Sequence, residues 1–470
     1  MLSINATYKG KNLTNMTITE RFADSILGVR FDDLSSAAID MAKAVALDGI
    51  AVGLAGATEP LGLGRIVTEY VRQLGGTPEA TVLAGGFQTA MPNAAFANGT
   101  MAHALDFDNT WYPLNHPTSP TLPAILAVGE ARGSSGRAII EAIVTAFEVQ
   151  ARLRLAATEW TTGRGFHKPG VTGIMGATAG AARLLGLNRD QLVMALGTAG
   201  SRAGSLAINT GTMTKSSHSG HAARMGVECA LLAGMGWTAS SRLFDAGGFF
   251  ESFTGGPGDP ELMLAGFGQP FRMVEPGVGF KKHPCNYFTH RPIDAALALR
   301  AQHELDPGSI VAVEVRFPRF DYVDRPEPAT GLDGKFSVQY TTAAALLDGV
   351  VTVESFTNER RFAPDMIAFL PRVRLRMDPA IPADFATMHV ELSVRLDDGR
   401  ILTRHQAELS GYPGQPLSRA ERVAKFEACA RRVIHTDRAT SALALVDTLE
   451  KQPNVRALMR LLRDPIPSKR

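Results

Sequence analysis

The stretch GVTGIMGATAGAARLLG, residues 170–186, decides the fold class of this chain. Its glycines Gly173, Gly176 and Gly180 recur at three- and four-residue spacing, which places them on one face of a helix. Such a face lets a neighbouring helix backbone approach closely, although each glycine lowers helix stability. Because the G-x-G-x-x-G spacing is missing and no strand precedes the stretch, the pattern favours helix packing over dinucleotide binding.

The sequence on both sides of this stretch repeats the same helical pattern. Residues 18–276 are rich in Ala, Gly, Leu and Met, and no strand-rich segment is evident there. Apolar periodicity predicts helices at residues 36–57, 64–75, 92–105, 119–132, 137–155, 170–186, 189–206 and 219–236. Ser119 followed by Pro120 predicts a helix start with Ser119 as its N-cap. This part of the chain is therefore expected to be all-helical.

The pattern changes after Pro276. Alternating apolar and polar residues predict strands at residues 309–318, 371–379, 388–396 and 401–409, with a tight turn at 397–400. Helical segments at about 292–303, 336–348 and 418–431 interleave with or follow them. We therefore predict a mainly α protein with an α+β second domain. Residues 1–276 and 412–470 would form one large all-helical domain, with residues 277–411 inserted as an α+β lid domain.

Composition limits the partners and the compartment. The 470 residues include 48 basic and 46 acidic side chains, a net charge of +2 that gives no sign of a nucleic-acid partner. The longest apolar run, residues 38–57, contains Asp40, Lys43 and Asp48 and does not predict a membrane span. Three widely spaced cysteines form neither a disulfide framework nor a zinc knuckle. We expect a cytoplasmic protein without a membrane or nucleic-acid partner.

The polar stretch HALDFDNTWYPLNHP, residues 103–117, interrupts this apolar sequence. Its side chains allow a metal site, an acid–base site or a polar loop without chemistry. The possible metal ligands are His103, Asp106, Asp108 and His116, with His167 farther along the chain. Because neither H-E-x-x-H nor a Cys–His set is present, no metal is predicted. The alternative without chemistry is that the two aspartates cap a helix or turn while His116 is solvated.

A second polar stretch, GTMTKS at residues 211–216, is similar to a phosphate-binding loop. The glycine that should precede Lys215 is Thr214, so nucleotide binding is not predicted. A loop rich in glycine and threonine that ends in lysine is nevertheless suited to anions. Its backbone N–H groups and the Lys215 ammonium can face one carboxylate.

Four motifs in order carry a resemblance that covers nearly the whole chain. They are HALDFDNTW…HP (103–117), GFHKPGVTG (165–173), GTMTKSSHSGHAARMG (211–226) and FKKHPCNYFTH (280–290). Together they resemble the MmgE/PrpD family, most closely its cis-aconitate decarboxylase and iminodisuccinate epimerase branch. The resemblance continues through DYVDRPEP (321–328) and FSVQYTTAAALLDGVVTVESF (336–356).

The resemblance implies a homodimeric enzyme that needs neither cofactor nor metal. It also implies a large helical domain built from both chain ends and an inserted lid. Members of the family act next to a carboxylate of small di- or tricarboxylic acids. They dehydrate 2-methylcitrate, decarboxylate cis-aconitate or epimerise iminodisuccinate.

The same motifs assign pocket residues position by position. The residues that match pocket positions of the decarboxylase are Asp106, Thr110, His116, His167, Lys215, Lys281 and the lid residue Tyr322. One departure is Asn286, which stands where the decarboxylase has a histidine and cannot transfer a proton near neutral pH. A second is His103, which replaces an arginine of the dehydratase branch and makes 2-methylcitrate dehydration a poorer match.

All of these reactions pass through a carbanion or enolate beside a carboxylate, which requires cations and a proton carrier. We hypothesise that His116 and His167 exchange the proton and that Lys215 and Lys281 hold substrate carboxylates. Asp106 would orient a histidine, and Thr110 and Tyr322 would supply hydrogen bonds. His218 and Asn286 complete the predicted substrate-binding set, although the sequence equally allows His218 to cap a helix.

Three functions fit this set of residues. The favoured one is a lyase, either a decarboxylase or a dehydratase of an aconitate- or citrate-like acid. The first alternative is an epimerase that removes and returns a proton next to a carboxylate, as on an iminodisuccinate-like dicarboxylate. The second is a non-catalytic carboxylate-binding protein on the same scaffold. The residues leave the substrate itself open.

Overall fold

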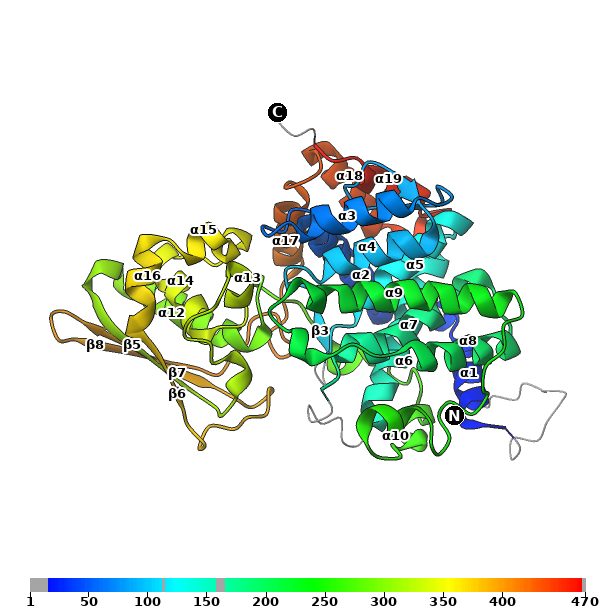
Figure 1. The fold of residues 1–470 in the computed structure, drawn as a ribbon, viewed down its shortest axis with the longest axis horizontal. Helices are drawn as coiled ribbons and strands as arrows, with labels where there is room; N and C mark the ends of the chain where they lie inside the picture. Colours follow the sequence, from blue (N-terminus) through cyan, green and yellow to red (C-terminus); the bar gives the residue numbers. More distant parts are fainter. Residues whose placement is uncertain (1–15, 112–114, 158–164, 467–470) are drawn as a thin grey trace.

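The computed structural model describes residues 16–111, 115–157 and 165–466. Figure 1 shows a larger helical lobe, which carries both ends of the described chain, and a smaller lobe that contains a four-stranded sheet. None of the helices in these ranges combines the length and apolarity that crossing a bilayer requires. A mainly α protein with a smaller α+β part was predicted, and this fold class is confirmed.

The larger lobe is built from helices contributed by the first and last parts of the chain. The first part supplies α1 (Ile18–Gly28), α2 (Ser36–Gly56), α3 (Leu63–Leu74), α4 (Met91–Ala102), α5 (Thr118–Arg132), α6 (Gly136–Ala156), α7 (Lys168–Leu185), α8 (Arg189–Arg202), α9 (Met213–Gly234), α10 (Phe249–Thr254) and α11 (Pro260–Leu264). The last part supplies α17 (Arg419–Ala430), α18 (Thr436–Asp447) and α19 (Arg456–Arg463). Every helix predicted from periodicity in this lobe is present, with ends shifted by a few residues.

Two details of the larger lobe differ from the prediction. Helix α5 begins at Thr118 after Pro117, and Ser119 does not cap it, because the Ser119 hydroxyl lies 3.0 Å from that of Ser219 on α9. The lobe is also not purely helical. Two antiparallel pairs of two-residue strands occur, β1 (Ala80–Thr81) with β2 (Gln88–Thr89) and β3 (Thr110–Trp111) with β4 (Val278–Gly279).

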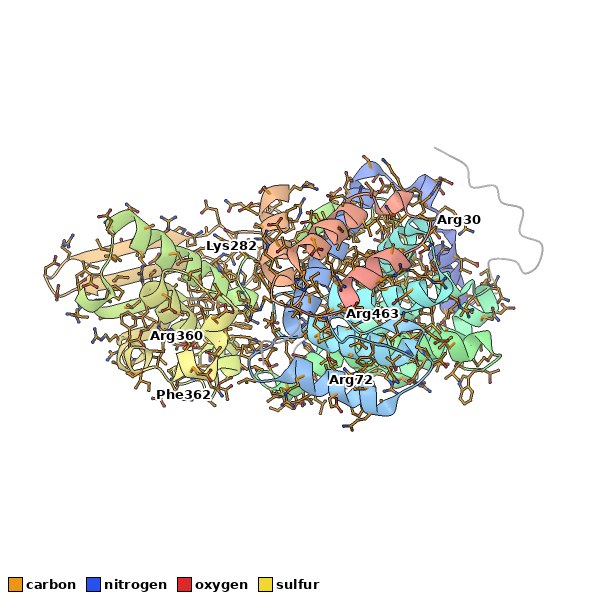
Figure 2. All side chains as sticks on the ribbon, turned by 90° about the horizontal axis from the view of Figure 1, so that it is seen from above. Arg30, Arg72, Lys282, Arg360, Phe362 and Arg463 are labelled. Carbon is orange, nitrogen blue, oxygen red and sulfur yellow. The ribbon has the colours of Figure 1, made fainter. Side chains whose placement is uncertain are left out.

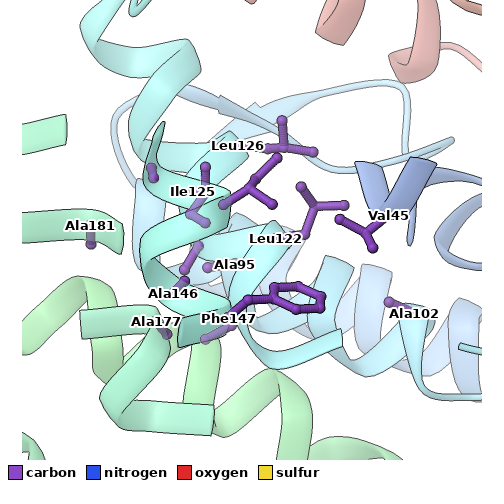
Figure 3. Close-up of a cluster of buried hydrophobic side chains, with 14 of the residues drawn as sticks. Val45, Ala95, Ala102, Leu122, Ile125, Leu126, Ala146, Phe147, Ala177 and Ala181 are labelled. Carbon is purple, nitrogen blue, oxygen red and sulfur yellow. The ribbon is translucent and has the colours of Figure 1, made fainter. Parts of the chain in front are cut away.

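The glycine-rich face of α7 brings three helices into close contact. A Cβ built on Gly173 would lie 2.6 Å from Pro120 on α5, and one on Gly176 would lie 2.7 Å from the Ala146 carbonyl oxygen on α6. Both distances are shorter than real Cβ contacts, so these positions require glycine. The predicted close approach of helix backbones is confirmed. Figure 3 shows the adjoining core, in which α5 and α6 side chains such as Leu122 and Phe147 pack together.

The smaller lobe packs helices against one mixed sheet. Its strands are β5 (Ile310–Phe317), β6 (Val373–Met377), β7 (Val390–Leu396) and β8 (Ile401–Gln406), in the order β6-β5-β7-β8. Strand β5 pairs parallel with β6 and antiparallel with β7, and β7 and β8 form the predicted hairpin. The helices are α12 (His290–His303), α13 (Gly331–Gly334), α14 (Val338–Asp348), α15 (Asn358–Arg361) and α16 (Pro364–Phe369).

The two lobes have separate hydrophobic cores. One buried cluster runs from Phe22 to Phe280 and takes in Val353 and residues between Leu417 and Leu462. The other lies wholly between Cys285 and Leu409. Contacts of α17 with α2 and of α19 with α5 return the C-terminal helices to the first core. The proposed division at residues 276/277 and 411/412 remains a prediction, and Val278, Phe280 and Val353 of the proposed lid belong to the first cluster.

Candidate active site

A pocket of about 390 Å³ is lined by residues of both lobes. Six of the nine predicted site residues line it: Thr110, His116, His167, Lys281, Asn286 and Tyr322. Of the other three, Asp106 contacts His116 and Lys281, His218 contacts His167, and Lys215 contacts Asp106. Residues from distant parts of the chain are thus brought together, as the resemblance implied.

Asp106 is held at the back of the pocket by two lysines. The Lys215 ammonium lies 2.5 Å from one carboxylate oxygen, and the Lys281 ammonium lies 3.1 Å from the other. Lys281 also donates a hydrogen bond to the Asp106 backbone carbonyl oxygen at 2.6 Å. The Asp106 backbone is in the left-handed region, with φ 49°. Burial alone raises the pKa of Asp106, but the two ammonium groups hold it well below its usual value. The three side chains therefore form a buried ionic cluster.

Asp108 orients two imidazoles. Its oxygens accept hydrogen bonds from His103 Nδ1 at 3.0 Å and from His116 Nδ1 at 3.1 Å. Because an ionised carboxylate only accepts, both Nδ1 atoms carry protons, and Nε2 of a neutral His116 has a free lone pair. Burial raises the pKa of Asp108, yet the two histidines hold it well below normal. Asp106 approaches His116 only to 3.8 Å, so the closer orienting carboxylate is Asp108.

His167 and His218 form a second pair of imidazoles. Their Nδ1 atoms lie 3.0 Å apart, so one donates a hydrogen bond to the other. Burial and the Lys215 charge hold the pKa of His167 well below its usual value and lower the pKa of His218 to about 4. His218 lies inside α9, which begins at Met213, so it does not cap that helix. It contacts a pocket histidine instead.

The remaining lining residues offer hydrogen-bond donors. The Thr110 hydroxyl is buried and has no hydrogen-bond partner among the residues that the structure describes. The Asn286 side-chain oxygen accepts from the Phe288 backbone N–H at 3.1 Å, which leaves the amide NH₂ group as a donor. Burial raises the pKa of Tyr322, so its hydroxyl stays neutral and able to donate. All three residues line the pocket and offer donors suited to an anionic group.

The polar stretch also brings four ligand-type groups together. One atom from each of His103, Asp106, Asp108 and His116 lies within 4.8 Å of the others. A cation there would meet the ammonium groups of Lys215 and Lys281, which already neutralise Asp106. This charge distribution favours an ionic and hydrogen-bonded network over a metal centre. A metal-free site remains a prediction.

The buried histidines make the stability of the fold depend on pH. Burial lowers the pKa of His103 to about 3, and those of His167 and His218 are lowered as well. Between these values and about 6.5, the unfolded chain binds protons that the folded chain does not, so stability falls on acidification. Each histidine contributes up to about 1.4 kcal/mol per pH unit in that window. Thermal unfolding should show a midpoint several degrees lower at pH 5 than at pH 7.5, and a flat profile would contradict this.

Sequence reasoning missed the roles of three residues. Asp108 was considered only as a metal ligand or turn cap, because nothing in the sequence says which aspartate reaches which histidine. Lys335 is buried, and its ammonium donates to the Ala104 carbonyl oxygen at 3.0 Å, while burial lowers its pKa to about 8. Lys168 lines the pocket. Its position directly after His167 in the GFHKP motif could have indicated that Lys168 lines the pocket.

Comparisons with known proteins agree with the resemblance. Residues 20–261 match the MmgE/PrpD N-terminal domain, and residues 283–451 match the MmgE/PrpD C-terminal domain. Cis-aconitate decarboxylase of Mus musculus is 33% identical over 96% of this chain and 94% of its own length. The Homo sapiens enzyme is 32% identical over 96% and 95%. A 2-methylcitrate dehydratase of Cupriavidus necator is 26% identical over 83% of this chain and 85% of its own length.

These comparisons confirm two predictions, the enzyme class and the family. Decarboxylases and dehydratases are both lyases, so the predicted enzyme class, an MmgE/PrpD-type lyase, is confirmed. The identity to the two mammalian decarboxylases extends over nearly the whole chain, so it covers both lobes and the pocket between them. The chain belongs to the MmgE/PrpD family.

Proposed function

We propose that the chain is a lyase that removes CO₂ from cis-aconitate or a closely related tricarboxylic acid. The observation that carries the proposal is the placement of His116. Its Nδ1 is fixed by Asp108, while the side chain lines a pocket shared with Lys281 and Thr110. The near full-length similarity to proteins named cis-aconitate decarboxylase supports this reaction over the others.

The chemistry defines what the pocket must supply. In cis-aconitate, the bond between the methylene carbon and its carboxylate breaks, and the electron pair forms a double bond to the central carbon. The electrons of the old double bond move to the far alkene carbon, which lies next to another carboxylate. That carbon takes up one proton, so a trianion and a proton give CO₂ and a dicarboxylate dianion. The site needs one acid and cationic or donor groups at the carboxylates.

We assign the acid role to His116. A proton on Nε2 makes the ring an imidazolium, and the Asp108 carboxylate at Nδ1 stabilises that charge. After the proton has passed to the carbanion, the neutral ring keeps the same hydrogen bond and regains a proton from solvent. Lys281 and Thr110 line the same pocket and are placed to receive a substrate carboxylate. Lys215 acts through Asp106, which it holds in place.

Asn286 narrows the choice of proton carrier. The resemblance places a histidine of the decarboxylase at this position, and asparagine cannot replace it as an acid. Its amide NH₂ group can donate a hydrogen bond to a carboxylate, because its oxygen is engaged by Phe288. The reaction therefore depends on His116, with His167 as the second imidazole on the pocket wall.

Epimerisation is a second candidate, and one observation favours it. His116 and His167 both line the pocket, and an epimerase needs two proton carriers that address opposite faces of one carbon. We rank it second because the similar proteins with near full-length coverage are named decarboxylases. Dehydration is ranked behind decarboxylation because His103 replaces the arginine of the dehydratase motif.

We also propose an oligomeric state, a cofactor requirement and a cellular compartment for the protein. The family resemblance supports a homodimer that works without a cofactor on a small carboxylic acid, and the composition of the chain supports a cytoplasmic setting. Sedimentation of the purified protein tests the dimer, and a chelator tests the metal requirement.

A panel of acids tests the proposed reaction. The purified protein is incubated with cis-aconitate, 2-methylcitrate or an iminodisuccinate, each with and without EDTA. We expect CO₂ and an unsaturated dicarboxylate from cis-aconitate, because the pocket combines an acid with cationic carboxylate sites. Loss of water from 2-methylcitrate, or inversion of the iminodisuccinate, without CO₂ from cis-aconitate would contradict the proposal. Activity that EDTA abolishes and one divalent ion restores would contradict the metal-free account.

A further inference from the structure

Lys168 is a cation of the pocket that the proposed reaction has not used. It is the first residue of α7, directly after His167, and it lines the same pocket as His116 and Tyr322. Its side chain is only half-buried. Within residues 16–111, 115–157 and 165–466, no carboxylate lies at ion-pair distance from its ammonium, and the charged neighbour that affects it most is Arg154 on α6.

The other lysines around the pocket are already engaged. Lys215 and Lys281 share the single negative charge of Asp106. Lys335 donates to a backbone carbonyl and faces Glu59 at 4.0 Å. The buried imidazoles of His103, His167 and His218 carry no charge at neutral pH, because their pKa values are lowered. Asp106 offsets only one of the two charges of Lys215 and Lys281, so this pair leaves one positive charge for a substrate with three carboxylates. Lys168 supplies a second on the described wall.

The surroundings of Lys168 favour an incoming anion. Burial and the neighbouring Arg154 lower the pKa of Lys168 to about 7, and among the described residues no carboxylate offsets the burial of its protonated form. A carboxylate beside it would offset that cost. The side chain also stands at the N-terminus of α7, a helix of 18 residues, whose dipole favours negative charge. Both effects act in the same direction and at the same place.

We propose that Lys168 binds the additional carboxylate that distinguishes a tricarboxylic from a dicarboxylic acid, and thereby sets the substrate class of the pocket. The contacts that carry the proposal are its position on the pocket wall, the engagement of the other lysines and the N-terminus of α7. The inference rests on the proposed function, since it concerns the same pocket and substrate.

Binding of unreactive acids tests this role without relying on turnover. Propane-1,2,3-tricarboxylate and glutarate form a matched pair that differs only in the central carboxylate. Calorimetry on the full chain should show that Lys168→Met weakens binding of the tricarboxylate by about 10- to 100-fold, the effect of one charge-assisted hydrogen bond. The same substitution, Lys168→Met, should change the affinity for glutarate by less than about threefold. Lys168→Arg, which keeps the charge, should restore most of the tricarboxylate affinity.

A second cation provides the control. Lys282 is exposed, lies near the junction of the lobes and does not line this pocket, so Lys282→Met removes a nearby charge without touching the site (Figure 2). It should leave both affinities unchanged. Equal losses for both acids in Lys168→Met, or no loss for the tricarboxylate, would overturn the proposal. Wild-type protein that binds the tricarboxylate but releases no CO₂ from cis-aconitate would refute only the reaction, whereas no tricarboxylate binding at all would refute both.

Discussion

Replacing His116 with glutamine is expected to lower kcat on cis-aconitate by about 10²- to 10⁴-fold, the usual contribution of a general acid. Glutamine has a similar reach and can still donate to Asp108, but it cannot deliver a proton to the carbanion. KM should change much less than kcat, because the variant keeps Lys281 and Thr110, which we propose to bind the substrate carboxylates in the same pocket. Steady-state kinetics on cis-aconitate, with circular dichroism as a check on folding, measure this.

A matched histidine outside the pocket serves as the control. His303 is exposed at the C-terminal end of α12, and His303→Gln should keep wild-type turnover. His167→Gln gives a useful contrast. In a decarboxylase that relies on His116, it should lower kcat less than His116→Gln does. A His116→Gln variant with near wild-type turnover would remove His116 from the mechanism.

Replacing Asp106 with asparagine is expected to destabilise the protein strongly. The change leaves Lys215 and Lys281 buried without their shared counter-charge, and uncompensated buried charges typically cost about 3–5 kcal/mol. The urea midpoint of unfolding should fall accordingly, and turnover should fall with it, because both lysines lose the group that fixes them. Removing one charge of the cluster at the same time, in Asp106→Asn with Lys215→Met, should recover part of the lost stability.

An exposed ion pair calibrates this effect. Asp398 pairs with Arg400 at 2.6 Å in the turn between β7 and β8, where both side chains are largely solvated. Asp398→Asn should cost no more than about 1 kcal/mol, as for other surface pairs. If Asp106→Asn were no more destabilising than Asp398→Asn, the buried ionic cluster would not be an important part of the fold.

Local patterns in the sequence were enough to predict most of the helices and strands. The glycine spacing of residues 170–186 predicted close helix packing, because it depends on one segment alone. The start of α5 was misplaced because Thr118 and Ser119, which look like capping residues, bond instead to Asn109 and Ser219. These partners lie 9 and 100 residues away in the sequence, outside the local pattern from which the helix start was predicted. The two-residue strands β3 and β4 escaped prediction for the same reason, since their pairing joins Thr110 to Gly279.

The sequence predicted which residues gather at the candidate site better than it predicted the contacts between them. The structure places the side chains that the motifs predicted in or directly behind one pocket, and their roles remain predictions. The motifs did not reveal that Lys215 and Lys281 face Asp106 and that Asp108 holds His116. Two aspartates separated by one residue are alike in sequence. Only the left-handed backbone at Asp106 and the surrounding helices decide which one meets a lysine and which a histidine.

Isotope labelling of one reaction tests the central claim most directly. Wild-type protein is incubated with cis-aconitate in D₂O, and the substrate, CO₂ and product are followed by NMR. Protonation of the carbanion by an acid that exchanges with solvent predicts one CO₂ for each product molecule, with one deuteron at the former alkene carbon. Deuterium that enters recovered cis-aconitate without release of CO₂, or no reaction at all, would contradict the account.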